Sequence, residues 1–126
     1  GRIINILSLL AKEPSAPMIL SATARAGVIA FTKSSSYEMA PNGVTINNIC
    51  PGGVLTKRFE TLLIERADKL NVSLDEFFKE RSKTVPLGRF ADPKEIGDIV
   101  TFLSSSKSSF ITGTSIIADG GQGKSV

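Results

Sequence analysis

The residues best suited to contact a small ligand lie in one short segment, residues 51–56, which reads Pro-Gly-Gly-Val-Leu-Thr. Its proline and glycines let the backbone approach a ligand closely. Thr56 can cap a following helix, or it can donate a hydrogen bond to a bound amide or phosphate. An ordinary strand-to-helix turn without a ligand uses the same residue types, so both interpretations stay open at this point.

A second pattern occupies residues 118–125, Ala-Asp-Gly-Gly-Gln-Gly-Lys-Ser, and fits a relaxed phosphate-loop motif with Ala118 in place of its first glycine. A working loop of this kind needs a following helix whose N-terminus faces the phosphates and a Mg²⁺-binding acid on another strand. Only Val126 follows here. We therefore interpret the segment as a flexible, Gly-rich terminus.

The composition excludes several classes of function. The 126 residues contain no histidine and one cysteine, Cys50, which rules out a zinc site, a Ser-His-Asp triad, a Cys-His dyad and an internal disulfide. This cysteine usage predicts a reducing, cytoplasmic location. The net charge of +3 is too small to indicate nucleic-acid binding, and no apolar run approaches the roughly 20 residues that span a bilayer. We expect one globular domain over residues 1–126, with neither nucleic acid nor membrane as a partner.

Three segments rich in β-branched residues predict buried strands: residues 2–7, 44–50 and 114–119. The segments between them have helical character, so the strands must be joined by crossover connections. Such connections give parallel strands in an open α/β sheet with helices on its faces. Ligands of such sheets bind beyond the carboxyl ends of the strands, which directs attention to residues 8–10, 51–56 and 120–121.

Four helices are expected, over residues 21–40, 56–70, 73–83 and 92–104. The first has a stripe of small residues, which predicts close packing on the sheet: Ala22, Ala26, Gly27 and Ala30. The last two begin with capping-box patterns, at Ser73 and at Asp92.

Several motifs in order make the chain resemble the C-terminal half of a short-chain dehydrogenase/reductase. They are residues 1–6 (Gly-Arg-Ile-Ile-Asn-Ile), 25–28 (Arg-Ala-Gly-Val), 47–52 (Asn-Asn-Ile-Cys-Pro-Gly), 86–90 (Pro-Leu-Gly-Arg-Phe), 110–113 (Phe-Ile-Thr-Gly) and 119–121 (Asp-Gly-Gly). The resemblance implies a doubly wound Rossmann-type fold, NAD or NADP as cofactor, hydride transfer between nicotinamide and a carbonyl or alcohol substrate, and a homodimer or homotetramer. Because the chain begins with glycine, we expect a fragment of a longer protein.

The resemblance also implies three catalytic positions. Ser8 stands where the family has the serine that binds the substrate oxygen. Ser21 and Arg25 stand where the family has Tyr-x-x-x-Lys, so both of those residues are replaced. Residues four apart share one helix face, which predicts that Ser21 and Arg25 point into the same pocket.

The replacement weakens the expected proton chemistry. A tyrosine phenol has a reference pKa near 10 that a neighbouring ammonium can lower, whereas an aliphatic hydroxyl is a far weaker acid. Arginine keeps its charge and can still hold a ribose hydroxyl. Tyr37 follows Arg25 by 12 residues, about 18 Å along a helix, which is too far to substitute. Lys12 and Glu13, in the loop after Ser8, either approach the pocket or are solvated loop charges, and the second interpretation is favoured.

The resemblance further implies which residues of this chain contact the cofactor: Arg25, Pro51, Gly52, Val54 and Thr56. It also implies that residues 56–83 form a helical flap over the substrate. Six apolar residues of the flap either line a substrate pocket or only pack two helices onto the body: Leu62, Leu63, Ile64, Leu70, Phe77 and Phe78. The family's first Gly-rich turn is not in this sequence, so the isolated chain is expected to be inactive. The alternative to a portion of an oxidoreductase is a catalytically impaired relative that acts as an oligomerisation module through residues 21–40.

Overall fold

Three parallel strands form the sheet, and β2 is its central strand. The computed structural model describes residues 1–125, so Val126, the last residue of the predicted domain, lies outside the described residues. β1 (Arg2–Ile6) pairs with β2 (Thr45–Pro51), and β2 pairs with β3 (Ser115–Ala118). The three predicted strands and their parallel pairing are confirmed, but the predicted burial holds throughout only for β2.

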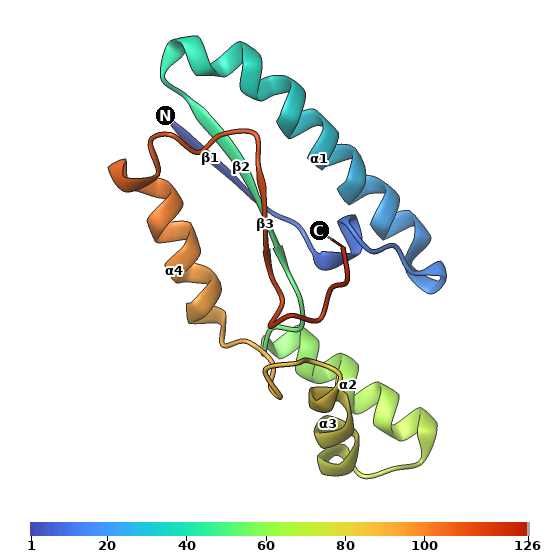
Figure 1. Cartoon of the computed structure of the whole chain (residues 1–126). Helices are drawn as coiled ribbons and strands as arrows, with labels where there is room; N and C mark the ends of the chain where they lie inside the picture. The colour runs from blue at the N-terminus through green and yellow to red at the C-terminus, as the bar shows by residue number, and fades with distance from the viewer. Residues whose placement is uncertain (126) are drawn as a thin grey trace.

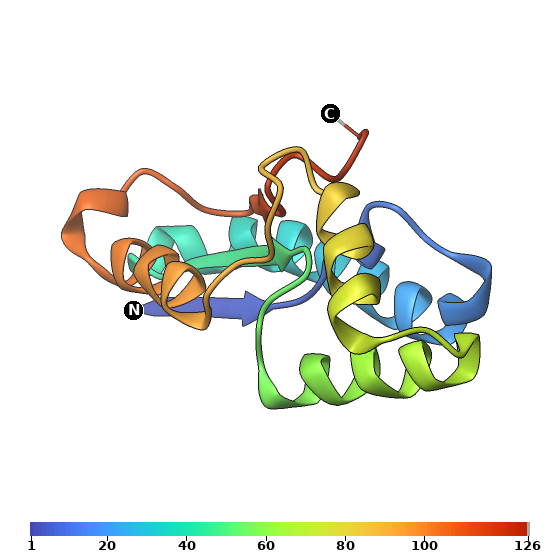
Figure 2. The ribbon, with the colours of Figure 1, turned by 90° about the horizontal axis from the view of Figure 1, so that it is seen from below.

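Helices cover both faces of this sheet, as the doubly wound α/β prediction requires. In Figure 1, α1 (Ile19–Met39) and α4 (Pro93–Ser104) lie on opposite sides of the strands. The other two helices, α2 (Lys57–Leu70) and α3 (Leu74–Lys83), pack on each other beyond the carboxyl ends of the strands (Figures 1 and 2). They correspond to the segment expected to form a flap.

The two faces of the sheet differ in polarity. On the α4 face, Ile49 of β2 packs with Ile96 and Leu103 in an apolar core. On the α1 face, the buried side chains of Thr32 and Asn48 are hydrogen-bonded, with 2.8 Å between the Thr32 hydroxyl and the Asn48 carbonyl oxygen. Satisfied polar groups of this kind can be buried at little cost.

The expected small-residue contact between α1 and the sheet is wrong for most of the stripe. Ala22 is buried, but Ala26, Gly27 and Ala30 are exposed. The other buried residues of the helix are polar, and they include Thr32. Hydrogen bonding, rather than small size alone, therefore selects the face of α1 that packs on the sheet.

Side-chain caps begin the three later helices. Thr56 and Ser73 each accept a hydrogen bond, both at 3.3 Å, from the backbone N–H three residues on. The Asp92 capping box is complete, because the Glu95 carboxylate also accepts the Asp92 N–H at 2.8 Å. The box expected at Ser73 is half-formed: in the described part of the chain, the Glu76 carboxylate accepts no reciprocal bond from the Ser73 N–H.

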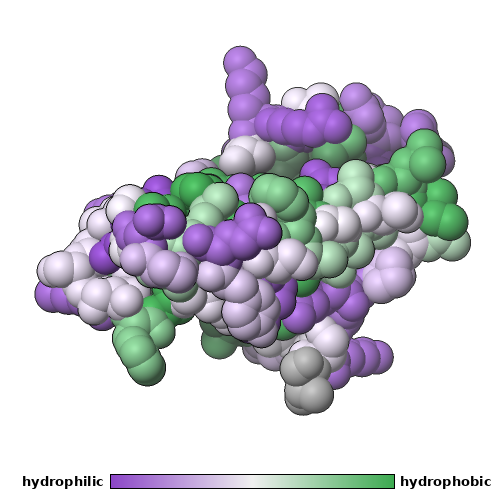
Figure 3. Space-filling view, turned by 90° about the horizontal axis from the view of Figure 1, so that it is seen from above, coloured by the Kyte–Doolittle hydropathy of each residue, from purple (hydrophilic) through white to green (hydrophobic). Residues whose placement is uncertain are grey.

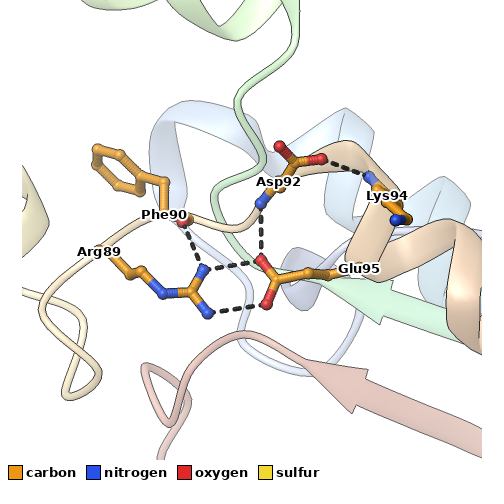
Figure 4. A network of polar contacts seen from close by, with 5 residues as sticks. All are labelled: Arg89, Phe90, Asp92, Lys94 and Glu95. Atoms are coloured by element: carbon orange, nitrogen blue, oxygen red, sulfur yellow. Dashed lines mark hydrogen bonds and ion pairs between the residues drawn. The ribbon is translucent and has the colours of Figure 1, made fainter.

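Arg89 reinforces the start of α4. Its guanidinium donates two hydrogen bonds to Glu95, at 2.7 and 2.8 Å, in the network drawn in Figure 4. Glu95 thus joins the loop before α4 to the cap of the helix. This pairing, together with the bond from the Asp92 N–H, lowers the pKa of the Glu95 carboxyl to about 2.

Four short 3-10 helices were not predicted. One of them, η1 (Leu9–Ala11), follows β1 directly and is capped by Ser8, whose hydroxyl accepts the Leu10 N–H at 3.2 Å. A serine directly after a strand was the available signal for this turn.

Candidate functional site

A cavity of about 310 Å³ lies at the carboxyl ends of β1 and β2. Six of the seven predicted site residues line it: Ser8, Arg25, Pro51, Gly52, Val54 and Thr56. They come from three separate parts of the chain, namely the end of β1, the first turns of α1 and the turn after β2. The parallel sheet therefore gathers them at one edge, as its topology predicts.

Ser8 is the N-cap residue of η1. Its oxygen accepts the Leu10 N–H, which leaves the hydroxyl hydrogen free to donate to a ligand. The side chain also lines a second cavity on the other side of the turn after β2.

Arg25 and Ser21 are in contact, but only Arg25 lines the cavity. The Arg25 Nη1 donates to the Ser21 carbonyl oxygen at 3.2 Å and to the Ser21 hydroxyl oxygen. Helical side chains tilt toward the N-terminus, which brings the guanidinium back to the level of Ser21. Ser21 thus anchors the arginine, and the prediction that both side chains point into one pocket holds for Arg25 alone.

The two glycines of the turn are required by packing within the protein. A Cβ on Gly52 would lie 2.9 Å from the Asp119 Cβ, and one on Gly53 would lie 2.6 Å from the Phe90 ring. Close approach of a ligand was the reason expected from the sequence. The structure instead gives close approach of β3 and of Phe90 as the cause.

The turn leaves hydrogen-bonding groups available at Val54 and Thr56. Val54 bridges to Ala91, but the bonds of that bridge use the Leu55 N–H and the Gly53 carbonyl oxygen. Within residues 1–125, the Val54 N–H has no acceptor. The Thr56 oxygen accepts the Phe59 N–H, and its hydroxyl hydrogen is free to donate. These donors fit a carboxamide, and the nearby guanidinium of Arg25 fits a hydroxyl-bearing sugar.

The sequence did not predict the second cavity, which has a volume of about 410 Å³. It shares Ser8, Pro51, Gly52 and Phe59 with the first cavity, so these residues form the partition between the two. Its other walls include Arg81, Phe90 and Gln122. Phe90 and Gln122 lie in motifs that the sequence analysis interpreted differently, whereas Arg81 lies in no motif and approaches Ser8 only through the tertiary fold.

Some apolar side chains of the segment 56–83 line a cavity, and others pack in the protein interior. Leu62 lines the cavity beside Arg25, whereas Leu63 is buried in a cluster with Val85 and Phe90, and Phe77 packs against that cluster. Leu70 is exposed. The packing alternative therefore holds for Leu63 and Phe77, and both alternatives stay open for the set as a whole.

Of the residues weighed as substitutes, Tyr37 lines neither cavity, whereas Glu13 lines the second one. Tyr37 is 70% exposed, and the Lys33 Nζ lies 5.4 Å from the centre of its ring. Glu13 is not a free loop charge, because it accepts the backbone N–H groups of Lys124 and Ser125. These bonds lower the pKa of the Glu13 carboxyl.

Backbone N–H groups of the Gly-rich segment 118–125 donate hydrogen bonds within the segment. The Asp119 carboxylate accepts the N–H of Gly121 at 2.9 Å and that of Gly123 at 2.6 Å. As far as Ser125 no helix follows β3. Most amide donors of the segment are therefore already used, and as far as Ser125 a phosphate would meet no helix N-terminus here.

No helix within residues 1–125 has the length and apolar character needed to cross a membrane. The same residues contain no group of three or more His, Cys, Asp or Glu side chains placed to hold a metal ion.

Comparisons with known proteins agree with this fold. The family described as enoyl-(acyl carrier protein) reductase matches residues 1–122. The NADPH-dependent reductase BacG of Bacillus subtilis is 34% identical over 126 residues, which are 100% of this chain and 49% of BacG. A short chain dehydrogenase family protein from Francisella tularensis superposes with a TM-score of 0.93 at 32% identity, over 97% of this chain and 50% of that one.

A third relative is a short chain oxidoreductase from Pseudomonas aeruginosa PAO1, solved with NADPH and described as containing an atypical catalytic center. It has a TM-score of 0.85 and 32% identity, over 100% of this chain and 47% of that one. The chain spans about half the length of the relatives it matches. It belongs to the short-chain dehydrogenase/reductase family.

Proposed function

We propose that this chain is the half of an NAD(P)-dependent short-chain oxidoreductase that holds the nicotinamide end of the cofactor and the substrate, and that the whole protein reduces a carbonyl group. The observation that carries the proposal is the cavity that brings Ser8, Arg25, Val54 and Thr56 together. The NADPH-dependent relatives support this choice of cofactor.

Each residue of the cavity has a role that its contacts allow. When bound, the nicotinamide dinucleotide supplies the hydride. The Val54 N–H and the Thr56 hydroxyl would hold its carboxamide beside the Pro51-Gly52 turn, and Arg25 would hold a ribose hydroxyl. The Ser8 hydroxyl donates to the substrate carbonyl oxygen, and Ser21 keeps Arg25 in place.

The proton that completes carbonyl reduction comes from solvent in this proposal. Ser8 can donate a hydrogen bond but is too weak an acid to act as the base that alcohol oxidation needs. Reduction is therefore favoured over oxidation. A relative with an atypical catalytic center shows that departures occur within this family.

The other half of the fold is proposed to lie outside these 126 residues. The sequence has no G-x-G-x-x-G turn, and β1 is an edge strand with Ile3 and Ile6 exposed. Exposed apolar edge strands usually have a partner. Sequencing the coding region on both sides tests the prediction of a C-terminal half: a G-x-G-x-x-G turn upstream supports it, and one downstream contradicts it.

We also propose that α2 and α3 cover the substrate and that the protein acts as a homodimer or homotetramer in the cytoplasm. The exposed side of α1 supports assembly, because Leu20, Ala24, Gly27 and Phe31 recur at helical spacing and are all exposed. Apolar surface is visible on this side of the molecule in Figure 3. Such a stripe can pair with a second copy of the helix.

The same stripe supports the second candidate, a non-catalytic assembly module. The proposed replacement of the family's tyrosine phenol is a separate argument for this candidate. Oxidation of NADPH by the purified full-length protein, followed over a panel of ketones and aldehydes, separates the two. Carbonyl-dependent oxidation that is lost in Ser8→Ala and Arg25→Met supports the enzyme. A folded, cofactor-binding protein that reduces none of the panel supports the module.

A further inference from the structure

The second cavity contains a cation without a partner. Its walls are the loop after β1, the turn after β2, Phe59, Phe90, Gln122 and Arg81. Its volume of about 410 Å³ falls within the range of small-molecule sites, which is about 300–1,000 Å³. Arg81 comes from the last turn of α3.

The Arg81 guanidinium lacks an acceptor. Its Nε is shielded from solvent and has no hydrogen-bond partner. Within residues 1–125, the two ion pairs join Lys83 to Glu80 and Arg89 to Glu95, so Arg81 belongs to neither. No hydrogen bond within the described residues uses the terminal nitrogens of Arg81 either, so these donors can bind an anion in the cavity that Arg81 lines.

The cavity itself does not supply that anion. Among its described lining residues, Glu13 is the one with a carboxylate, and this carboxylate accepts the N–H groups of Lys124 and Ser125. Glu13 is therefore committed to the chain end and makes no ion pair with Arg81 within the described residues.

The opposite side of the same cavity holds the reacting end of the site. Ser8 lines both cavities, so a carbonyl oxygen bound by its hydroxyl also lies beside Arg25 and Val54. The Phe59 and Phe90 rings line the cavity too, in edge-to-face contact with 5.0 Å between their centres. A ligand here meets a hydroxyl donor, an apolar wall and a cation.

We infer that the substrate is an oxo acid, with its carbonyl oxygen on Ser8 and its carboxylate on Arg81. The inference rests on the proposed function for the carbonyl reaction. A guanidinium has a planar fork of donors that matches a carboxylate in two parallel hydrogen bonds. Arg81 thereby selects an acid over its neutral ester.

The test compares matched acids and esters in the full-length protein. The probes are 2-oxopentanoate and 4-oxopentanoate with their methyl esters, measured by calorimetry for binding and by NADPH oxidation for turnover. Arg81→Gln should weaken binding of the acid that binds wild type, and lower its kcat/KM, by about 10- to 100-fold, as expected for a charge-assisted pair. The esters should be unaffected, and Arg81→Lys should recover part of the loss.

Lys79→Gln is the matched control, because Lys79 is an exposed cation on the same helix and does not line the cavity. Equal losses for acid and ester, equal losses in Lys79→Gln, or no binding of either acid by wild type would overturn the inference. Reduction of esters in that last case would leave the proposed function standing. Binding of an acid through Arg81 without any reduction would instead support the carboxylate site and contradict the proposed function.

Discussion

At the scale of single residues, the proposal that Ser21 and Arg25 replace the tyrosine and lysine of the family leads to a direct test. A positioned general acid contributes about 10²- to 10⁴-fold to a rate. In the full-length protein, Ser21→Tyr combined with Arg25→Lys should raise the rate of carbonyl reduction by up to that factor, because a phenol beside an ammonium exchanges protons near neutral pH. Steady-state kinetics with NADPH measure the change.

The larger ring is the main risk of this double variant. Ser21 is half-buried. Overpacking a site commonly lowers the free energy of unfolding by about 1–3 kcal/mol. Melting curves and cofactor binding must therefore accompany the kinetics, with Ser21→Tyr alone as the control that keeps Arg25. An unchanged rate in a folded double variant that binds cofactor would count against hydride chemistry at this site.

Cys50 should be chemically silent in the folded protein. It lies in β2 with no exposed surface, and desolvation raises the pKa of its thiol. Thiol reagents attack the thiolate, which is scarce when the pKa is raised and access is blocked. A colorimetric thiol assay should show little reaction near neutral pH until guanidinium unfolds the chain. Rapid labelling under native conditions would contradict the assigned burial of β2.

At the scale of elements, the start of α4 should give the protein an acid-sensitive cap. The folded pKa of Glu95 is about 2, well below the value of roughly 4.3 for a free glutamate. Its contribution to stability is therefore fully present above pH 4.3 and is lost as the pH falls toward 2. The melting temperature should fall over this window, and Glu95→Gln should flatten that part of the profile.

Asp98→Asn provides the control for this experiment. Asp98 lies on the same helix and has no ion-pair partner within residues 1–125. Its variant should keep the wild-type slope of melting temperature against pH. A Glu95→Gln profile parallel to wild type would show that the contacts with Arg89 and the Asp92 N–H do not stabilise the helix in solution.

The elements themselves were largely predictable because their signals are local. β-branched runs mark the three strands, and the caps at Thr56, Ser73 and Asp92 mark helix starts that the structure confirms. The buried face of α1 was not predictable. It depends on hydrogen bonds such as that between Thr32 and Asn48, whose partners are far apart in the sequence.

The candidate site divides in the same way. Ser8 and residues 51–56 could be assigned to one edge because the carboxyl ends of parallel strands meet there. Arg81 could not, since it reaches the second cavity from α3, and Gln122 lies in the segment that was interpreted as a flexible terminus. Sequence patterns report which residues share a face, but not which faces come together.

At the scale of the whole molecule, the exposed stripe on α1 should mediate self-association. Phe31 is 60% exposed at the centre of the helix. Phe31→Glu places a charge in the proposed interface and should shift the full-length protein toward monomer in light scattering coupled to size exclusion. Tyr37→Glu makes the same change at an exposed aromatic residue on another face of α1 and should leave the mass unchanged. An oligomer that survives Phe31→Glu would place the interface elsewhere.

The division of the cofactor site between two halves gives the last prediction. This chain offers donors for a carboxamide at Val54 and Thr56 and a cation for a ribose at Arg25. It has no G-x-G-x-x-G turn at a helix N-terminus, which is the feature that binds a pyrophosphate in this type of fold. The isolated 126 residues should therefore bind NADPH much more weakly than the full-length protein. Calorimetry on both, with circular dichroism to verify that the isolated chain is folded, measures the difference. Low-micromolar binding to the isolated chain would mean that the pyrophosphate is held by residues of this half, and the division proposed for the site would then be wrong.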